Sequence, residues 1–87
     1  MEPTDPYAVV FSGEIRLILP TLPVEARVAL AEILEILAFR PWQSIQYHPR
    51  LAYEWRSAPF GDGLGLVGFV VSEKQHRVIV VHVTWLG

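Results

Sequence analysis

The residues of this chain that could do chemistry are cations and imidazoles in its second half. Four of them are candidate catalytic residues: Arg56, Arg50, His48 and His82. Arginine stabilises charge that develops on phosphate oxygens, and histidine transfers protons near neutral pH. These residue types therefore suit chemistry at a phosphate group, provided that the fold brings them together.

Each candidate also has a purely structural interpretation. Arg56 alternates with aromatic residues and could equally be a strand charge that faces water. Arg50 and His48 flank a proline in a loop, where charged side chains commonly face solvent. His82 stands in an apolar stretch, which suits a hydrogen-bonded core residue. Both interpretations of each residue stay open at this point.

Other catalytic and binding motifs are absent from the sequence. Gly61, Gly63 and Gly65 lie between two expected strands, so they indicate turns rather than a phosphate loop, which needs a helix N-terminus. The chain has no cysteine, its three histidines lack zinc-site spacing, and no serine stands in a nucleophile elbow. We therefore expect no cofactor, no metal ion and no serine-hydrolase chemistry.

Length and composition predict one small domain, residues 1–87, that meets a partner. Hydrophobic residues make up 52% of the chain and charged residues only 18%, which is apolar for a surface that faces only water. No apolar run reaches the roughly 18 residues of a membrane span. The N-terminus carries acids and prolines where a secretory signal has a basic and an apolar segment. We expect a cytoplasmic protein that stays out of the membrane.

The charge distribution limits the affinity of the whole chain for nucleic acid. The formal net charge is −2 and the pI is about 5.8. Residues 1–44 carry six acids and three bases, whereas residues 45–87 carry three acids and four bases. Only the C-terminal half could therefore form a basic face. Three tryptophans could stack on bases, but core packing is their simpler interpretation in so small a domain: Trp42, Trp55 and Trp85.

The first half of the sequence predicts one strand and two helices. Residues 7–12 are β-branched and aromatic, which favours a strand, and a short helix is expected over 14–19. Pro23 suits the first residue of a second helix that ends near Phe39. Its apolar stripe consists of Leu30, Ile33, Leu34 and Leu37. This spacing is typical of a face packed on a sheet, and the short helix is expected to cover part of the remaining apolar surface.

The second half predicts a loop followed by three strands. The loop spans 40–51, and the strands span 52–57, 64–71 and 77–85. The last strand is expected to present two alternating faces. One face would hold Ile79, Val81, Val83 and Trp85, and the other Val78, Val80, His82 and Thr84. The element order is therefore β-α-α-β-β-β, an α+β arrangement.

The sequence resembles the RelE/ParE family of bacterial toxins over nearly its whole length. The likeness is strongest near the N-terminus, with a strand ending in Phe11-Ser12, a short helix, Leu22-Pro23, and Glu25-Ala26-Arg27 at the start of a helix. The second half contributes Tyr53, Trp55 and Arg56 on one strand, Phe69-Val70-Val71 on the next, and a final Val-Ile-Val-Val strand. The resemblance implies a helix hairpin packed on one face of a twisted antiparallel sheet.

The same resemblance implies the toxin component of a type II toxin–antitoxin system. The principal partner would be a cognate antitoxin protein, in a complex that can be oligomeric. Some members bind RNA at the ribosome and act as metal-independent mRNA interferases, and others poison DNA gyrase. For RNA cleavage, Arg56 and Arg50 would stabilise the phosphate while His48 or His82 moves the proton of the attacking ribose 2′-hydroxyl.

Two departures from the family leave enzymatic activity open. Nuclease members carry an arginine at the start of the third strand, where this chain has Gly65-Leu66-Val67, and they continue past the last strand. The first hypothesis is therefore a toxin that resembles the mRNA interferases but lacks some of their catalytic residues. The alternative is a non-catalytic protein-binding module of the same fold, either gyrase-directed or a degenerate toxin homologue.

Overall fold

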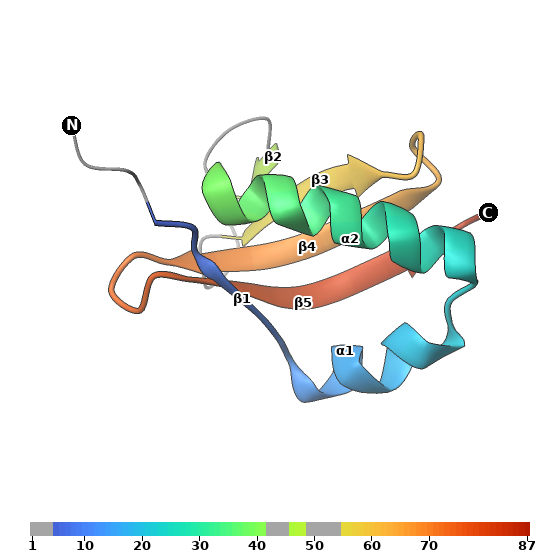
Figure 1. The fold of residues 1–87 in the computed structure, drawn as a ribbon, viewed down its shortest axis with the longest axis horizontal. Coiled ribbons are helices and arrows are strands. Elements are labelled where there is room, and N and C mark those ends of the chain that lie inside the picture. The colour runs from blue at the N-terminus through green and yellow to red at the C-terminus, as the bar shows by residue number, and fades with distance from the viewer. Residues whose placement is uncertain (1–4, 42–45, 49–54) are drawn as a thin grey trace.

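A computed structural model of the chain, which describes residues 5–41, 46–48 and 55–87, has two helices packed against a five-stranded sheet (Figure 1). The elements are β1 (Ala8–Phe11), α1 (Gly13–Ile18), the 3-10 helix η1 (Leu19–Thr21), α2 (Val24–Phe39), β2 (Gln46–His48), β3 (Trp55–Phe60), β4 (Gly65–Ser72) and β5 (Arg77–Trp85). The strand order across the sheet is β1-β5-β4-β3-β2. The predicted α+β class is confirmed.

The two edge strands differ from the prediction. β2 lies within the segment 40–51, which was expected to be a loop, and pairs antiparallel with β3. β1 pairs with β5 in parallel, so the sheet is mixed rather than wholly antiparallel. Tight turns between successive strands enforce antiparallel pairing, but the helices separate β1 from the next strand along the chain, so no turn sets its direction.

The central strand pair is antiparallel and contains a β-bulge. Phe69 pairs with Val80, whereas the preceding Gly68 pairs with His82, which leaves Val81 as an extra residue in β5. The expected strict alternation in β5 is therefore wrong beyond this point. Val83 joins Val78 and Val80 on the buried side of the sheet. A run of valines gives no sequence signal for the position at which the phase changes.

α2 forms where the sequence predicts it and buries most of the predicted stripe. Pro23 occupies its N-cap position, and the helix ends before Pro41. The buried residues of α2 are Ala26, Leu30, Leu34 and Leu37. Ile33 is only half-buried, so the buried stripe is shifted slightly around the helix from the predicted one. No helix within the described residues is long and apolar enough to cross a membrane.

α1 does not cover α2 as the expected helix hairpin would. It packs on β1 and β5, and Figure 1 places it beside the sheet edge while α2 crosses the strands. Val28 and Ile36 on α2 consequently remain more than half exposed. The helix is therefore apolar on a side that no other described element covers.

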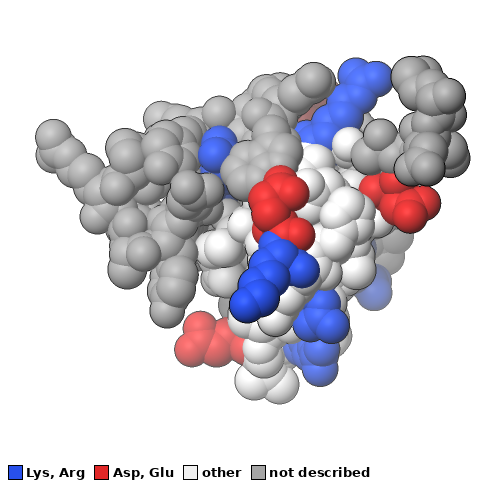
Figure 2. All heavy atoms as spheres, turned by 90° about the vertical axis from the view of Figure 1, so that its left-hand side faces the viewer, with Lys and Arg blue, Asp and Glu red and all other residues white. Residues whose placement is uncertain are grey.

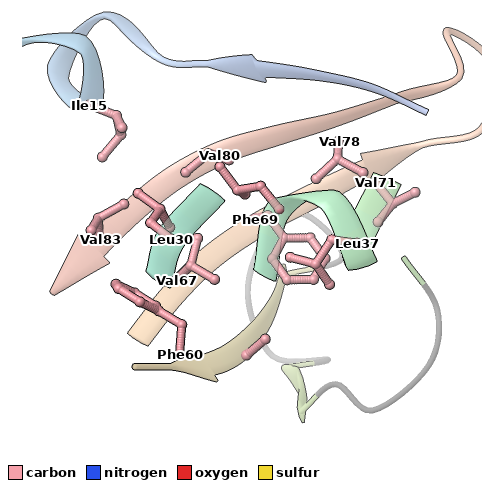
Figure 3. Packing of buried hydrophobic residues seen from close by; sticks show 12 residues of the cluster. Ile15, Leu30, Leu37, Phe60, Val67, Phe69, Val71, Val78, Val80 and Val83 are labelled. Atoms are coloured by element: carbon pink, nitrogen blue, oxygen red, sulfur yellow. The ribbon is translucent and has the colours of Figure 1, made fainter. Parts of the chain in front are cut away.

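The core lies between α2 and the inner face of the sheet, with α1 closing one side (Figure 3). Its largest fully buried side chain is Phe69, at 0% exposure, in the middle of the central strand β4. The other core residues are Ile15, Leu30, Leu34, Leu37, Ala58, Phe60, Val67, Val71, Val78, Val80 and Val83. All are hydrophobic, so the core is held by apolar burial and close packing.

Replacing the central aromatic of this core should destabilise the fold strongly. We expect Phe69→Ala to lower the free energy of unfolding by about 3–5 kcal/mol, because it removes a buried ring and leaves a cavity. Phe39→Ala is the matched control, since Phe39 is 55% exposed at the end of α2, and should cost less than about 1 kcal/mol. Urea denaturation followed by circular dichroism measures both. Equal losses would contradict the assigned core.

Candidate functional site

The strand register places Arg56 on the helix-covered face of the sheet. Residues paired directly across neighbouring strands point to the same face. Arg56 pairs with Phe69, and Ala58, two residues further on in β3, pairs with Val67. Both partners on β4 are core residues. The Arg56 side chain is accordingly half-buried, and its Nε atom is shielded from solvent.

His82 lies on the opposite face of the sheet, which we call the outer face. His82 pairs with Gly68, and Gly68 pairs with Ser57 on its other side, so the three form one row across the sheet. The imidazole is exposed, and its Nε2 atom lies 2.6 Å from Oγ1 of Thr84. His82 is thus a solvent-accessible group that could exchange protons with a bound molecule.

The four predicted site residues are only partly visible in the structure. Arg50 lies outside the described residues. His48 is described at its backbone, which pairs with Trp55 in the β2–β3 ladder. Arg56 and His82 project from opposite faces of one sheet, so these two cannot act on the same substrate atom. The register thus separates Arg56 from His82, and the catalytic roles of the four residues stay predictions.

Arg77 is a cation of the outer face that sequence reasoning missed. It pairs with Ser72 at the start of β5 and is exposed. Strict alternation would put residues 77 and 82 on opposite faces, but the bulge at Val81 shifts the phase and brings both to the outer face. The two positions are roughly 15 Å apart along the strand, too far for both side chains to hold one phosphate without rearrangement.

The described part of the outer face carries apolar side chains among its polar ones. Leu66 is 42% exposed in the middle of the sheet. Val70 and Ile79 pair with each other and are half-buried. A sheet face with exposed apolar side chains is typical of a protein contact surface. Within the described segments, no group of three His, Asp or Glu residues could hold a metal ion.

A second cluster of polar side chains joins the chain before β1 to the β4–β5 turn. The Tyr7 hydroxyl donates to Oε1 of Glu73 at 2.7 Å, and the Tyr7 ring stacks on His76 at 4.0 Å between centroids. Nε2 of His76 lies 2.9 Å from the backbone oxygen of Asp5. Because every member of the cluster contacts another, we assign it a structural role in fastening the edge strand.

The same end of the molecule offers no separate basic area among its described residues. Figure 2 views this end and shows basic and acidic side chains lying next to one another. Strong phosphate binding needs basic groups gathered on one surface. The described charges at this end are therefore of mixed sign.

The fold is that of solved RelE toxins. The chain matches RelE in the archaeal RelE–RelB complex from Pyrococcus horikoshii OT3 with a TM-score of 0.70 and 16% identity, over 93% of this chain and 96% of the other. It also matches a chain of the toxin–antitoxin complex RelBE2 from Mycobacterium tuberculosis with a TM-score of 0.72 and 22% identity, over 98% and 97% of the two chains. The predicted likeness is confirmed at the level of the fold.

Comparison of sequences alone finds no relative. No family profile matches the chain, and no curated protein does. The likeness to RelE toxins is therefore carried by the arrangement of helices and strands.

The opposite placement of Arg56 and His82 should be measurable as a difference in stability. We expect Arg56→Ala to lower the free energy of unfolding by about 1–2 kcal/mol, because the aliphatic stem of Arg56 packs on the helix-covered face. His82→Ala should change it by less than about 0.5 kcal/mol, since the ring is exposed. Thermal and urea denaturation would report both values. A neutral Arg56→Ala would show that the side chain is not packed there.

Proposed function

We propose that this chain is the toxin component of a type II toxin–antitoxin pair, acting in the cytoplasm and silenced by a cognate antitoxin protein. The observation that carries the proposal is the match to two solved toxins over nearly the whole of each chain. Both of those toxins were solved together with antitoxins. The proposal explains why so small a chain carries so many apolar residues.

The exposed apolar side of α2 is the surface that we assign to the antitoxin. Val28 and Ile36 point away from the core, and Phe39 extends the same apolar area at the end of the helix. A hollow beside this end is lined by Ile36, Phe39, Glu35 and Arg40. An apolar helix face bordered by charges suits an amphipathic partner segment that folds as it binds. We call these three apolar residues the α2 surface.

For the mode of action, the geometry favours binding over RNA cleavage. Cleavage by the sequence-predicted residues would need an arginine and a histidine at one phosphate. Arg56 lies on the opposite face from His82, and the second predicted arginine, Arg50, lies outside the described residues. Arg77 is on the face of His82 but distant from it. The exposed apolar side chain of Leu66 on the outer face supports a protein target. We therefore prefer the non-catalytic toxin to the mRNA interferase.

The α2 surface and the outer face should show different roles when neutralisation by the antitoxin is tested. We expect Ile36→Asp to abolish binding of the antitoxin, which would be sought in small reading frames next to the gene, while growth arrest on induced expression persists. Leu66→Asp is the matched variant on the other face, since Leu66 is 42% and Ile36 53% exposed. It should keep antitoxin binding and lose growth arrest. Co-purification and growth curves measure the two outcomes, with circular dichroism to confirm folding.

Several results of this test would contradict the proposal. Growth arrest by neither the wild type nor Ile36→Asp would contradict a toxin. Retained antitoxin binding by Ile36→Asp would move the antitoxin away from the α2 surface. Loss of both activities in a folded Leu66→Asp variant would mean that the two faces do not have separate partners.

Substitution of Arg77 and His82, two polar residues of the outer face, distinguishes a toxin that acts by binding from one that cleaves RNA. We expect the double variant Arg77→Ala/His82→Ala to arrest growth as the wild type does, because a binding toxin needs neither a proton donor nor a phosphate-stabilising cation. Sequencing of cellular RNA ends should reveal no new cleavage sites with either protein. New RNA ends produced by the wild type and lost in the double variant would establish a nuclease instead.

A further inference from the structure

A pocket opens between the start of α2, the β3–β4 turn and the end of β5. Figure 1 shows these three segments at the end of the molecule away from the β4–β5 turn. Its volume is about 450 Å³. Its lining includes Glu25, Asp62, Leu64 and the indole of Trp85, and no lysine or arginine of the described segments lines it. This pocket is separate from the α2 surface and from His82, and the proposed function gives it no role.

The indole wall of the pocket is held firmly. The Trp85 ring stacks on Phe60, with 5.7 Å between ring centroids and 22° between planes. Gly61 packs against its edge so closely that a Cβ at that position would lie 2.6 Å from the ring. The Leu86 amide also donates to the Leu64 carbonyl at 2.8 Å, which ties the end of β5 to the turn. The ring is therefore already in place for a ligand.

The electrostatics of the pocket favour a cation. Its two carboxylates contribute a formal charge of about −2, against roughly +0.5 from the nearby N-terminus of α2. A cation over an indole face also gains from the ring quadrupole, by about 0.5–1 kcal/mol at an exposed site. Leu64 supplies apolar surface for an aliphatic stem. The combination matches a long side chain that ends in a positive charge.

The indole nitrogen of Trp85 provides a second, independent observation. Nε1 is buried and has no hydrogen-bond acceptor among the described residues. A buried N–H group without an acceptor is unfavourable by about 1–3 kcal/mol. Gly87 lies against this nitrogen, so a polypeptide that moves Gly87 aside would bring backbone carbonyl groups, which are the acceptors that the N–H lacks. The feature suits a peptide ligand better than a free metal ion.

We propose that this pocket binds an arginine or lysine side chain of a bound polypeptide. The charged end lies between the carboxylates of Glu25 and Asp62, and its stem runs along the Trp85 indole and Leu64. The pocket chemistry stands without the proposed function. That the polypeptide is the antitoxin rests on the proposed function, and implies an antitoxin segment with a basic residue that reaches the end of β5.

Small probes test the pocket directly. We expect N-acetyl-arginine methylamide to shift the assigned indole resonance of Trp85 in ¹H–¹⁵N spectra, and the neutral citrulline analogue to shift it much less. Glu25→Gln and Asp62→Asn should each lower the association constant of the arginine probe about 2- to 5-fold. Glu32→Gln, an exposed change on α2 away from the pocket lining, should leave it unchanged.

The outcomes separate the pocket from its proposed occupant. The cation-binding pocket would be overturned if the citrulline analogue shifted the Trp85 resonance as much as the arginine probe does. It would also be overturned if the Glu25→Gln and Asp62→Asn variants bound the arginine probe as tightly as the wild type. Displacement of the arginine probe by the antitoxin would support the antitoxin as the occupant. Simultaneous binding of probe and antitoxin would overturn that occupant while the pocket itself stands. Growth arrest is measured separately, so failure of the toxin proposal would be recognised on its own.

Discussion

Burial of the central strand β4 is the constraint on which the other elements depend. Phe69 sits at its middle, with α2 above and strands on either side. In a chain of this length, a single core must supply nearly all the apolar stabilisation, because a small domain buries a limited fraction of its surface. Both helices and the long strand β5 contribute side chains to that one cluster. The outer face and the edge strands are consequently free to vary in chemistry.

Most of the fold follows from local sequence signals. Pro23 and Pro41 bracket α2, and the strand bounds 77–85 come directly from a run of β-branched residues between two turns. β2 was missed because three residues carry too little periodicity to distinguish a strand from a loop. The parallel placement of β1 depends on a long-range pairing with Val78 and its neighbours, for which local sequence contains no signal.

The site was harder to predict than the fold, for a reason of geometry. Residue type singled out His82 as a group that could transfer protons; the structure shows that it is exposed, and its role stays a prediction. The face on which each residue lies depends on register, and register shifts with every bulge. Arg56 therefore lies on the helix-covered face beside the core, and Arg77 lies on the outer face with His82. Alternation along one strand could reveal neither placement. The pocket at Trp85 unites residues distant in sequence, so only the folded chain displays it.

The bulge at Val81 also determines how this chain can change over evolutionary time. Substitutions in β5 alter one side chain, and many of its positions would accept another β-branched residue. A deletion of Val81 acts differently, because it would remove the bulge and make the alternation of side chains along β5 regular. His82 would then follow Val80 directly and could still pair with Gly68 on the outer face, so Trp85 would keep its place beside Phe60. The bulge is accordingly a position at which β5 can lose one residue while the pairing on both sides of it is kept.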